Sequence, residues 1–170
     1  MKKVILISAV AGLFIVSMAF AQMGGGMMGR GGYNYGYPQK FSSNGEQIYF
    51  TGTSSRGGVI PFEGGPMWLR MHGGGCASCH GSSGRGGAPV MMGTAIPPDI
   101  RYNSLTSGEH HHHEEGEKGE ENEKYTDDLI KRAITRGLDP EGKPLDWTMP
   151  RYYMRDADFQ DLLEYLKTLK

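Results

Sequence analysis

Cysteine is scarce in this sequence: only two of the 170 residues are cysteines, and they lie three positions apart, as Cys76 and Cys79. A disulfide between them would close a very short ring, which constrains little of the unfolded chain. Beyond the first 21 residues, no stretch is long and apolar enough to cross a bilayer. No basic patch stands out and the formal net charge is −1 at pH 7, which argues against a nucleic-acid partner. The sequence also lacks internal repeats and strand-rich regions, so it favours a helical, loop-rich fold.

The N-terminus has the pattern of a cleavable secretory signal peptide. Lys2 and Lys3 precede an apolar run, which ends at the A-x-A cleavage site Ala19-Phe20-Ala21. We expect residues 1–21 to be removed, with an uncleaved anchor helix as the alternative. No cysteine follows the cleavage site, which excludes a bacterial lipoprotein anchor. The pattern predicts a periplasmic protein of a Gram-negative bacterium that has no transmembrane segment after signal removal.

Two further segments are too polar or too rich in glycine to pack. Residues 22–40 are mostly Gly, Met and Tyr, and we interpret them as a flexible leader. Residues 108–124 contain no apolar side chain, so we expect a solvated loop. The remaining body, residues 41–170, is predicted to form one domain with insertions at about 51–75 and 108–124. Such a small, glycine-rich body needs a disulfide, a metal or a large cofactor for stability.

Three helices are predicted from capping residues and hydrophobic spacing. The first covers residues 45–50 after a cap at Ser43 or Asn44. The second begins after Thr126 and ends at Gly137. The third begins with Asp156 as its cap, and its apolar residues follow helical spacing to the C-terminus. A brief strand pairing at 59–63 is also allowed by the sequence.

Four interpretations of the cysteine motif compete. A short structural disulfide is compatible with secretion. A redox-active pair normally opens a helix in a βαβ unit, a pattern that this sequence lacks. A zinc site would need His72, Cys76, Cys79 and His80 to supply all four ligands from nine residues, whereas structural zinc sites draw two pairs from separate segments. The fourth interpretation is covalent haem attachment, for which C-x-x-C-H is the specific signal.

Haem attachment explains the spacing of the motif. Two thiols one helical turn apart reach the two vinyl groups on one edge of the porphyrin, and the following His80 reaches the iron. Gly75 and Gly81, on either side, are expected to leave room for a flat macrocycle close to the backbone. We therefore predict one covalently attached haem c, with Cys76 and Cys79 as its thioether ligands.

A methionine is the expected ligand on the opposite side of the iron. Met149 lies in a loop between the two best predicted helices, and Pro150 stiffens that loop. Met154 is the runner-up, and the pair Met91 and Met92 is a further alternative. Ordinary core packing is the competing role for any of these methionines.

Together these features resemble the class I c-type cytochromes over roughly residues 43–170. The motif "CASCHG" resembles the family's haem attachment site, "TMP" at 148–150 its distal methionine loop, and "DADFQDLLEYLKTL" at 156–169 its final helix. The resemblance implies a small all-α domain wrapped around one haem, with the first and last helices crossing. Gly45 and Tyr49 would meet Tyr165 and Leu166 at that crossing. The stretch 51–75 and the acidic loop depart from the family pattern.

A ligating histidine usually donates its second ring nitrogen to a carbonyl, which fixes the ring. The family uses a proline carbonyl shortly after the motif, and Pro89 is the nearest match, with Pro97 and Pro98 as alternatives.

Buried haem propionates need hydrogen-bond donors. The candidates are Trp147, Arg101, Tyr102 and Arg151, although Trp147 could instead be a packed aromatic beside the haem.

The run His110, His111, His112 and His113 lies beside several glutamates. It could bind Zn, Cu or Ni weakly, and the alternative is a plain solvated loop.

We expect a mono-haem electron carrier that docks redox protein partners at the haem edge, and not an enzyme. Three alternatives remain open from the sequence. The protein could be a haem subunit of a larger oxidoreductase, a Cu- or Ni-handling protein, or a gas-binding haem protein.

Overall fold

The first helix of the described domain is fixed by its caps. The computed structural model describes residues 40–107 and 124–170, in which α2 covers Asn44–Thr51. The Ser43 hydroxyl accepts a hydrogen bond from the backbone N–H of Glu46, and Gly52 ends the helix in the left-handed conformation at φ 66°. Both features confirm the prediction of a short helix capped at this position.

The second and third predicted helices are also present. Helix α6 covers Asp127–Arg136, with Thr126 as its N-cap and the left-handed Gly137 at its C-terminus, as predicted. Helix α7 covers Asp156–Thr168. The prediction that Asp156 caps α7 is wrong: Arg155 occupies the cap position in extended backbone, and Asp156 is the first helical residue, where its charge suits the helix dipole.

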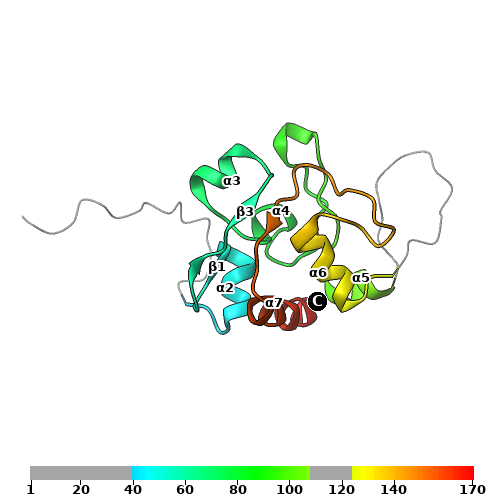
Figure 1. Ribbon diagram of the computed structural model, residues 1–170. Coiled ribbons are helices and arrows are strands. Elements are labelled where there is room, and N and C mark those ends of the chain that lie inside the picture. The colour runs from blue at the N-terminus through cyan, green and yellow to red at the C-terminus, as the bar shows by residue number, and fades with distance from the viewer. Residues whose placement is uncertain (1–39, 108–123) are drawn as a thin grey trace, which may run out of the picture. The chain divides into compact units, whose positions relative to one another are not determined.

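Helices α2 and α7 cross closely at Gly45, in the lower part of Figure 1. A Cβ atom on Gly45 would lie 1.9 Å from the carbonyl oxygen of Asp161 and 2.9 Å from the Cβ of Tyr165, so only glycine allows this approach. The crossing confirms that Gly45 meets Tyr165. Around it lies a core whose most buried members are Ile48, Tyr49, Phe159, Leu162 and Leu163.

The stretch 51–75 folds into two small strand pairs and a helix. Strands β1 (Thr53–Ser54) and β2 (Gly58–Val59) form an antiparallel hairpin. Strand β3 (Phe62–Glu63) pairs with β4 (Arg151–Tyr152), which lies far along the sequence. Helix α3 (Met67–His72) follows. The pairing expected near 59–63 is therefore present, split around Pro61.

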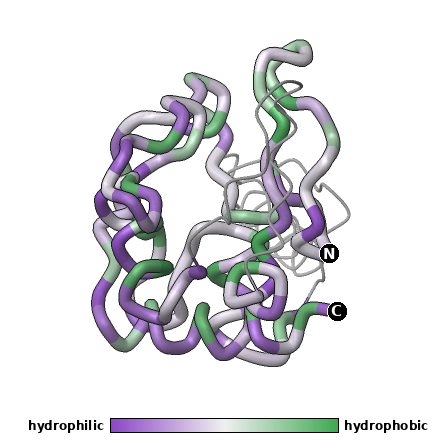
Figure 2. The backbone as a smooth tube through the Cα atoms, turned by 90° about the vertical axis from the view of Figure 1, so that its right-hand side faces the viewer, coloured by the Kyte–Doolittle hydropathy of each residue, from purple (hydrophilic) through white to green (hydrophobic). Residues whose placement is uncertain are grey.

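The remaining elements are short. They are α4 (Ala77–His80), the 3₁₀ turn η1 (Met91–Gly93) and α5 (Tyr102–Ser107). Hydrophobic and hydrophilic residues alternate along the helices in the lower half of Figure 2, as expected for helices with one buried face. The described part of the chain is thus a small, mainly helical domain, and its short strand pairs qualify the all-α expectation.

Several predictions concern residues that are not described. The signal peptide, the leader except for Lys40, the acidic loop except for Lys124, and His110 to His113 all lie outside the described residues. No helix in the described part of the chain combines the length and the apolar character needed to cross a membrane.

Candidate functional site

The two cysteines lie on a single turn of helix. The backbone N–H of His80 donates to the carbonyl of Cys76 (2.9 Å), and that of Gly81 donates to Ala77 (3.0 Å). Cys76 and Cys79 are not joined to each other by a disulfide. Residues three apart in a helix share a face, so the two thiols can reach the same edge of one cofactor.

Glycines flank this turn for reasons that the sequence did not reveal. A Cβ atom on Gly75 would lie 2.3 Å from the carbonyl oxygen of Tyr49, so Gly75 allows close contact with the end of α2. Gly81 has a φ of 75°, which suits glycine, and its carbonyl accepts a hydrogen bond from the Tyr49 hydroxyl (2.6 Å). The motif is therefore anchored to α2 on both sides.

The His80 side chain is a buried, neutral imidazole with one ring nitrogen held by a hydrogen bond. Its side chain is buried, with 6% exposed, and Nδ1 lies 2.8 Å from the carbonyl oxygen of Pro98. A carbonyl only accepts hydrogen bonds, so Nδ1 carries the proton and Nε2 keeps the lone pair that binds a metal. Burial lowers the pKa of His80, against the opposing effect of the Pro98 hydrogen bond. The ring is therefore neutral and oriented.

The carbonyl that orients His80 comes from Pro98, so the prediction of Pro89 is wrong and the alternative Pro98 is right. Gly86 makes this possible, because a Cβ atom there would lie 2.1 Å from the carbonyl oxygen of Pro97 and 2.4 Å from that of Pro98. The backbone N–H of Gly86 also donates a hydrogen bond to the backbone carbonyl of His80 (2.9 Å). The role of Gly86 was not predicted from the sequence, although the adjacent glycines at 86–87 and the adjacent prolines at 97–98 indicate a close backbone contact.

The surroundings of the thiols argue against the redox interpretation. Burial raises the pKa of Cys76 to about 12 and also raises the pKa of Cys79, whereas redox-active cysteines have a lowered pKa. Within residues 40–107 and 124–170, no three His, Cys, Asp or Glu side chains gather so as to hold a metal ion. The four ligands that a zinc site would require are therefore not brought together.

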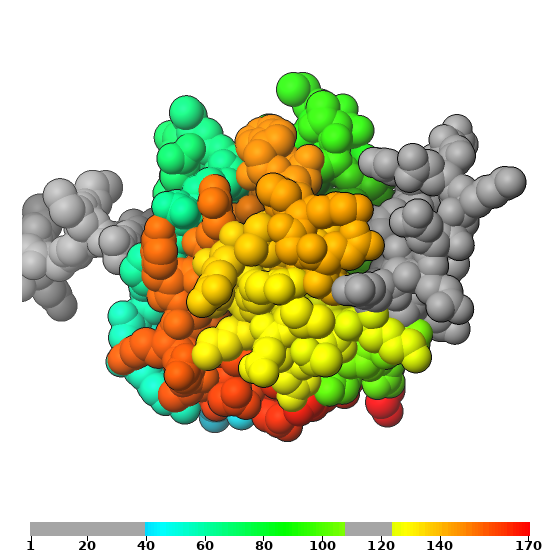
Figure 3. Space-filling view, turned by 45° about the vertical axis from the view of Figure 1, so that its right-hand side comes forward, coloured from blue at the N-terminus to red at the C-terminus, as the bar shows by residue number. Residues whose placement is uncertain are grey.

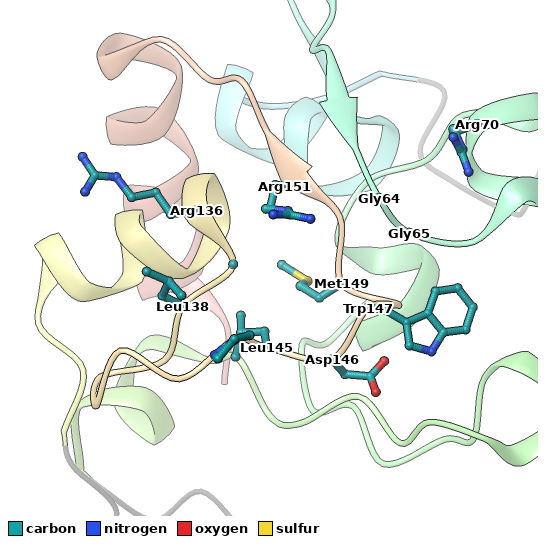
Figure 4. Close-up of a pocket in the computed structure, with 12 residues that line it drawn as sticks. Gly64, Gly65, Arg70, Arg136, Leu138, Leu145, Asp146, Trp147, Met149 and Arg151 are labelled. Carbon is teal, nitrogen blue, oxygen red and sulfur yellow. The ribbon is translucent and has the colours of Figure 1, made fainter.

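Met149 lines a cavity of about 480 Å³. Figure 4 shows its side chain reaching into the space bordered by Arg151, Leu138 and Leu145. A turn fixes its position: the backbone N–H of Met149 donates to the carbonyl of Asp146 (3.0 Å), and the Asp146 carboxylate accepts from the N–H of Thr148 (2.8 Å). The segment 138–150 that carries this turn lies directly above α6 in Figure 3.

The other candidate methionines have different surroundings. Met154 is half-buried and packs against the hydrophobic core. Met91 and Met92 both have positive φ angles, and Met92 is fully exposed. Among the methionines of the described segments, Met149 is thus the one that lines this cavity.

The four residues predicted to donate hydrogen bonds to the haem propionates lie in two different places. Arg101 pairs with Asp99 (2.5 Å), and the Tyr102 hydroxyl donates to Asp127 (2.9 Å). Trp147 and Arg151 border the Met149 cavity. Trp147 is 62% exposed and lies at the rim of this cavity, where it stays a candidate both as a propionate donor and as an aromatic beside the haem.

Tyr152 connects the attachment turn with the Met149 loop. It follows Met149 by three residues and belongs to the same buried cluster as Ala77 and Cys76. Burial and the nearby Cys76 and Cys79 thiols raise the pKa of Tyr152. His80 is not among the residues that line the Met149 cavity. The cysteines, a neutral histidine and a methionine-bearing loop nevertheless share one part of the domain, and these donors fit a covalently bound haem.

Comparison with known proteins gives one match. A model of the cytochrome c family matches residues 70–170, which include the attachment turn, the Met149 loop and α7. Searches of curated proteins and of solved structures found no significant match.

Proposed function

The chain belongs to the cytochrome c family, and on that premise we propose that it is a periplasmic mono-haem electron carrier whose iron is held by His80 and Met149. The protein carries one haem c, attached through Cys76 and Cys79. The bound haem supplies a one-electron iron couple. The observation that carries the ligand assignment is the buried His80 ring, with Nδ1 fixed on Pro98 and Nε2 left to bind.

Met149 would be the second protein ligand of the iron in this proposal. A thioether favours ferrous iron more than a second imidazole does, so Met149 would raise the reduction potential. An iron held by both His80 and Met149 would leave no coordination site for a substrate. We therefore propose a carrier and not an enzyme.

Secretion and transient docking complete the proposal. Residues 1–21 have the composition of a signal peptide, which supports the periplasm. Redox partners would dock briefly at the haem edge over less than about 1,200 Å² in total, the range of weak electron-transfer encounters.

The test compares wild-type, Met149→Ala and Met154→Ala proteins matured with a cytochrome c assembly system. We expect Met149→Ala to keep covalent haem in denaturing mass spectrometry, to lose the sulfur-to-iron charge-transfer band, and to have a lower potential. It should also bind carbon monoxide in the ferrous state. Met154→Ala should do none of these. Rapid carbon monoxide binding by the wild-type protein would contradict the closed site and favour a gas-binding function.

A further inference from the structure

A short segment before the attachment motif contacts the Met149 loop on its N-terminal side. The backbone N–H of Gly65 donates to the carbonyl of Trp147 (3.2 Å). Gly65 has a φ of 69°, and a Cβ atom there would lie 3.2 Å from the Cβ of Pro150. Gly65 therefore lies against the residues that flank Met149 on both sides.

The same segment pairs with the chain just after Met149. Phe62 pairs with Tyr152 and Glu63 with Arg151 in the antiparallel β3–β4 ladder. The backbone N–H of Tyr153 donates to the carbonyl of Pro61 (2.8 Å). This pairing extends the contact to the C-terminal side of the loop.

Side chains reinforce the ladder. The rings of Phe62 and Tyr152 lie with their centroids 5.4 Å apart, a distance typical of a favourable aromatic pair. Arg151 Nε lies 3.6 Å from the Glu63 carboxylate, and both side chains are about half exposed, so this ion pair adds little. The aromatic pair and the backbone bonds therefore provide most of the attachment.

The preceding part of the loop is held by other groups. The Arg132 guanidinium donates to the carbonyls of Asp139 and Pro140, and the backbone N–H of Leu145 donates to Gly137 (2.8 Å). These contacts fix residues 139–145, whereas residues 61–65 contact 147–153. The two sets of contacts act on different parts of the same loop.

We propose that residues 61–65 form a clasp that keeps the Met149 sulfur on the iron, an inference that rests on the proposed His80 and Met149 ligation. A neutral thioether is a weak ligand, so its occupancy depends on how firmly the loop is preorganised. The clasp precedes the matched cytochrome c segment, which begins at residue 70. Gly65 and Phe62 are thus positioning residues that act through Met149.

The test uses Gly65→Ala and Phe62→Ala in the full, haem-loaded protein. Gly58→Ala is the matched control, because Gly58 also has a positive φ, at 72°, but a Cβ atom there meets nothing within 4 Å. We expect both clasp variants to retain covalent haem, to lose the charge-transfer band at a lower temperature, and to have a lower potential. Their ferrous forms should bind carbon monoxide about tenfold faster than the control, which corresponds to about 1.4 kcal/mol.

The outcomes separate the clasp from the ligand assignment. If both variants match Gly58→Ala in band stability, potential and carbon monoxide binding, the clasp is wrong. If Gly65→Ala does not yield folded protein, Phe62→Ala alone decides between the two results. If Met149→Ala keeps the charge-transfer band, the ligand assignment itself fails, and the clasp proposal falls with it for a reason that is visible in the spectrum.

Discussion

The imidazole of His80 depends on a carbonyl that lies 18 residues further along the chain. Pro89 is nearer in sequence, but it is exposed, whereas the close approach of Gly86 to residues 97–98 brings the Pro98 carbonyl to Nδ1 of the ring. The sequence alone predicts His80 as an iron ligand, because C-x-x-C-H is a local chemical requirement. It does not predict which carbonyl accepts the hydrogen bond from Nδ1. That choice depends on the conformation of the glycine-rich loop after the motif, and such a loop can adopt several conformations.

We predict that Gly86→Ala weakens this hydrogen bond and raises the reduction potential. A Cβ atom at Gly86 must displace the Pro97 and Pro98 carbonyls, from which it would lie 2.1 and 2.4 Å. Donation from Nδ1 makes the imidazole a more basic ligand, which favours ferric iron, so weakening it favours the ferrous state. Voltammetry of the haem-loaded protein measures the shift.

Gly87→Ala is the control for this prediction. Gly87 also has a positive φ, at 77°, but a Cβ atom there meets nothing within 4 Å. An equal change of potential in both variants would mean that backbone strain, and not the Pro98 carbonyl, sets the effect.

At the scale of elements, local signals predict the helices and long-range contacts decide the rest. Ser43, Thr126 and Gly137 act as the caps that their residue types predict. The β3–β4 pair is different, because Phe62 and Tyr152 are 90 residues apart and neither two-residue strand has a pattern long enough to detect. Propensity acts on neighbours, so a pairing made by distant segments is invisible to it.

A buried carboxylate joins the inserted hairpin to α7. Asp158 is 2% exposed and accepts hydrogen bonds from the Ser54 hydroxyl (2.6 Å), Arg56 (3.1 Å) and Arg155 (3.1 Å), with a longer bond from Asn44 (3.3 Å). Burial acts to raise the pKa of Asp158, but these hydrogen bonds together outweigh it and the pKa is lowered. The charged form is thus the one that the fold stabilises.

We predict that Asp158 contributes stability above the unfolded pKa of about 3.9, and that this contribution is lost as the pH falls through its lower folded pKa. Denaturant unfolding at pH 7 and at about pH 3 measures the loss. Asp158→Asn should be less stable than wild type at pH 7 by about 2 kcal/mol, because a neutral amide replaces the buried carboxylate that accepts these hydrogen bonds, and the difference should shrink at the lower pH. A difference that is constant with pH would contradict this role.

Over the whole molecule, the core lies mainly between helices. Most of its buried side chains belong to α2, α6 and α7, with Leu69 added from α3, while the attachment turn and the Met149 loop carry few of them. The family and the cofactor could be predicted because they depend on a short motif and three helices. The arrangement of the glycine-rich connections could not, because it depends on close backbone approaches such as those at Gly75 and Gly86.

We predict that the chain without haem loses most of its ordered structure. A small, loop-rich domain needs an additional source of stability, and a group bound only by the folded state adds its binding free energy to that of folding. Chains produced with and without the haem assembly system should differ in circular dichroism, with low helix content and no cooperative thermal transition in the haem-free chain. Cys79→Ala, which keeps one thioether, should retain a cooperative transition at a lower temperature than the doubly attached protein. A haem-free chain with full helix content and a cooperative transition would contradict this prediction. It would show that the core of α2, α6 and α7 folds by itself and that the haem is not required for folding.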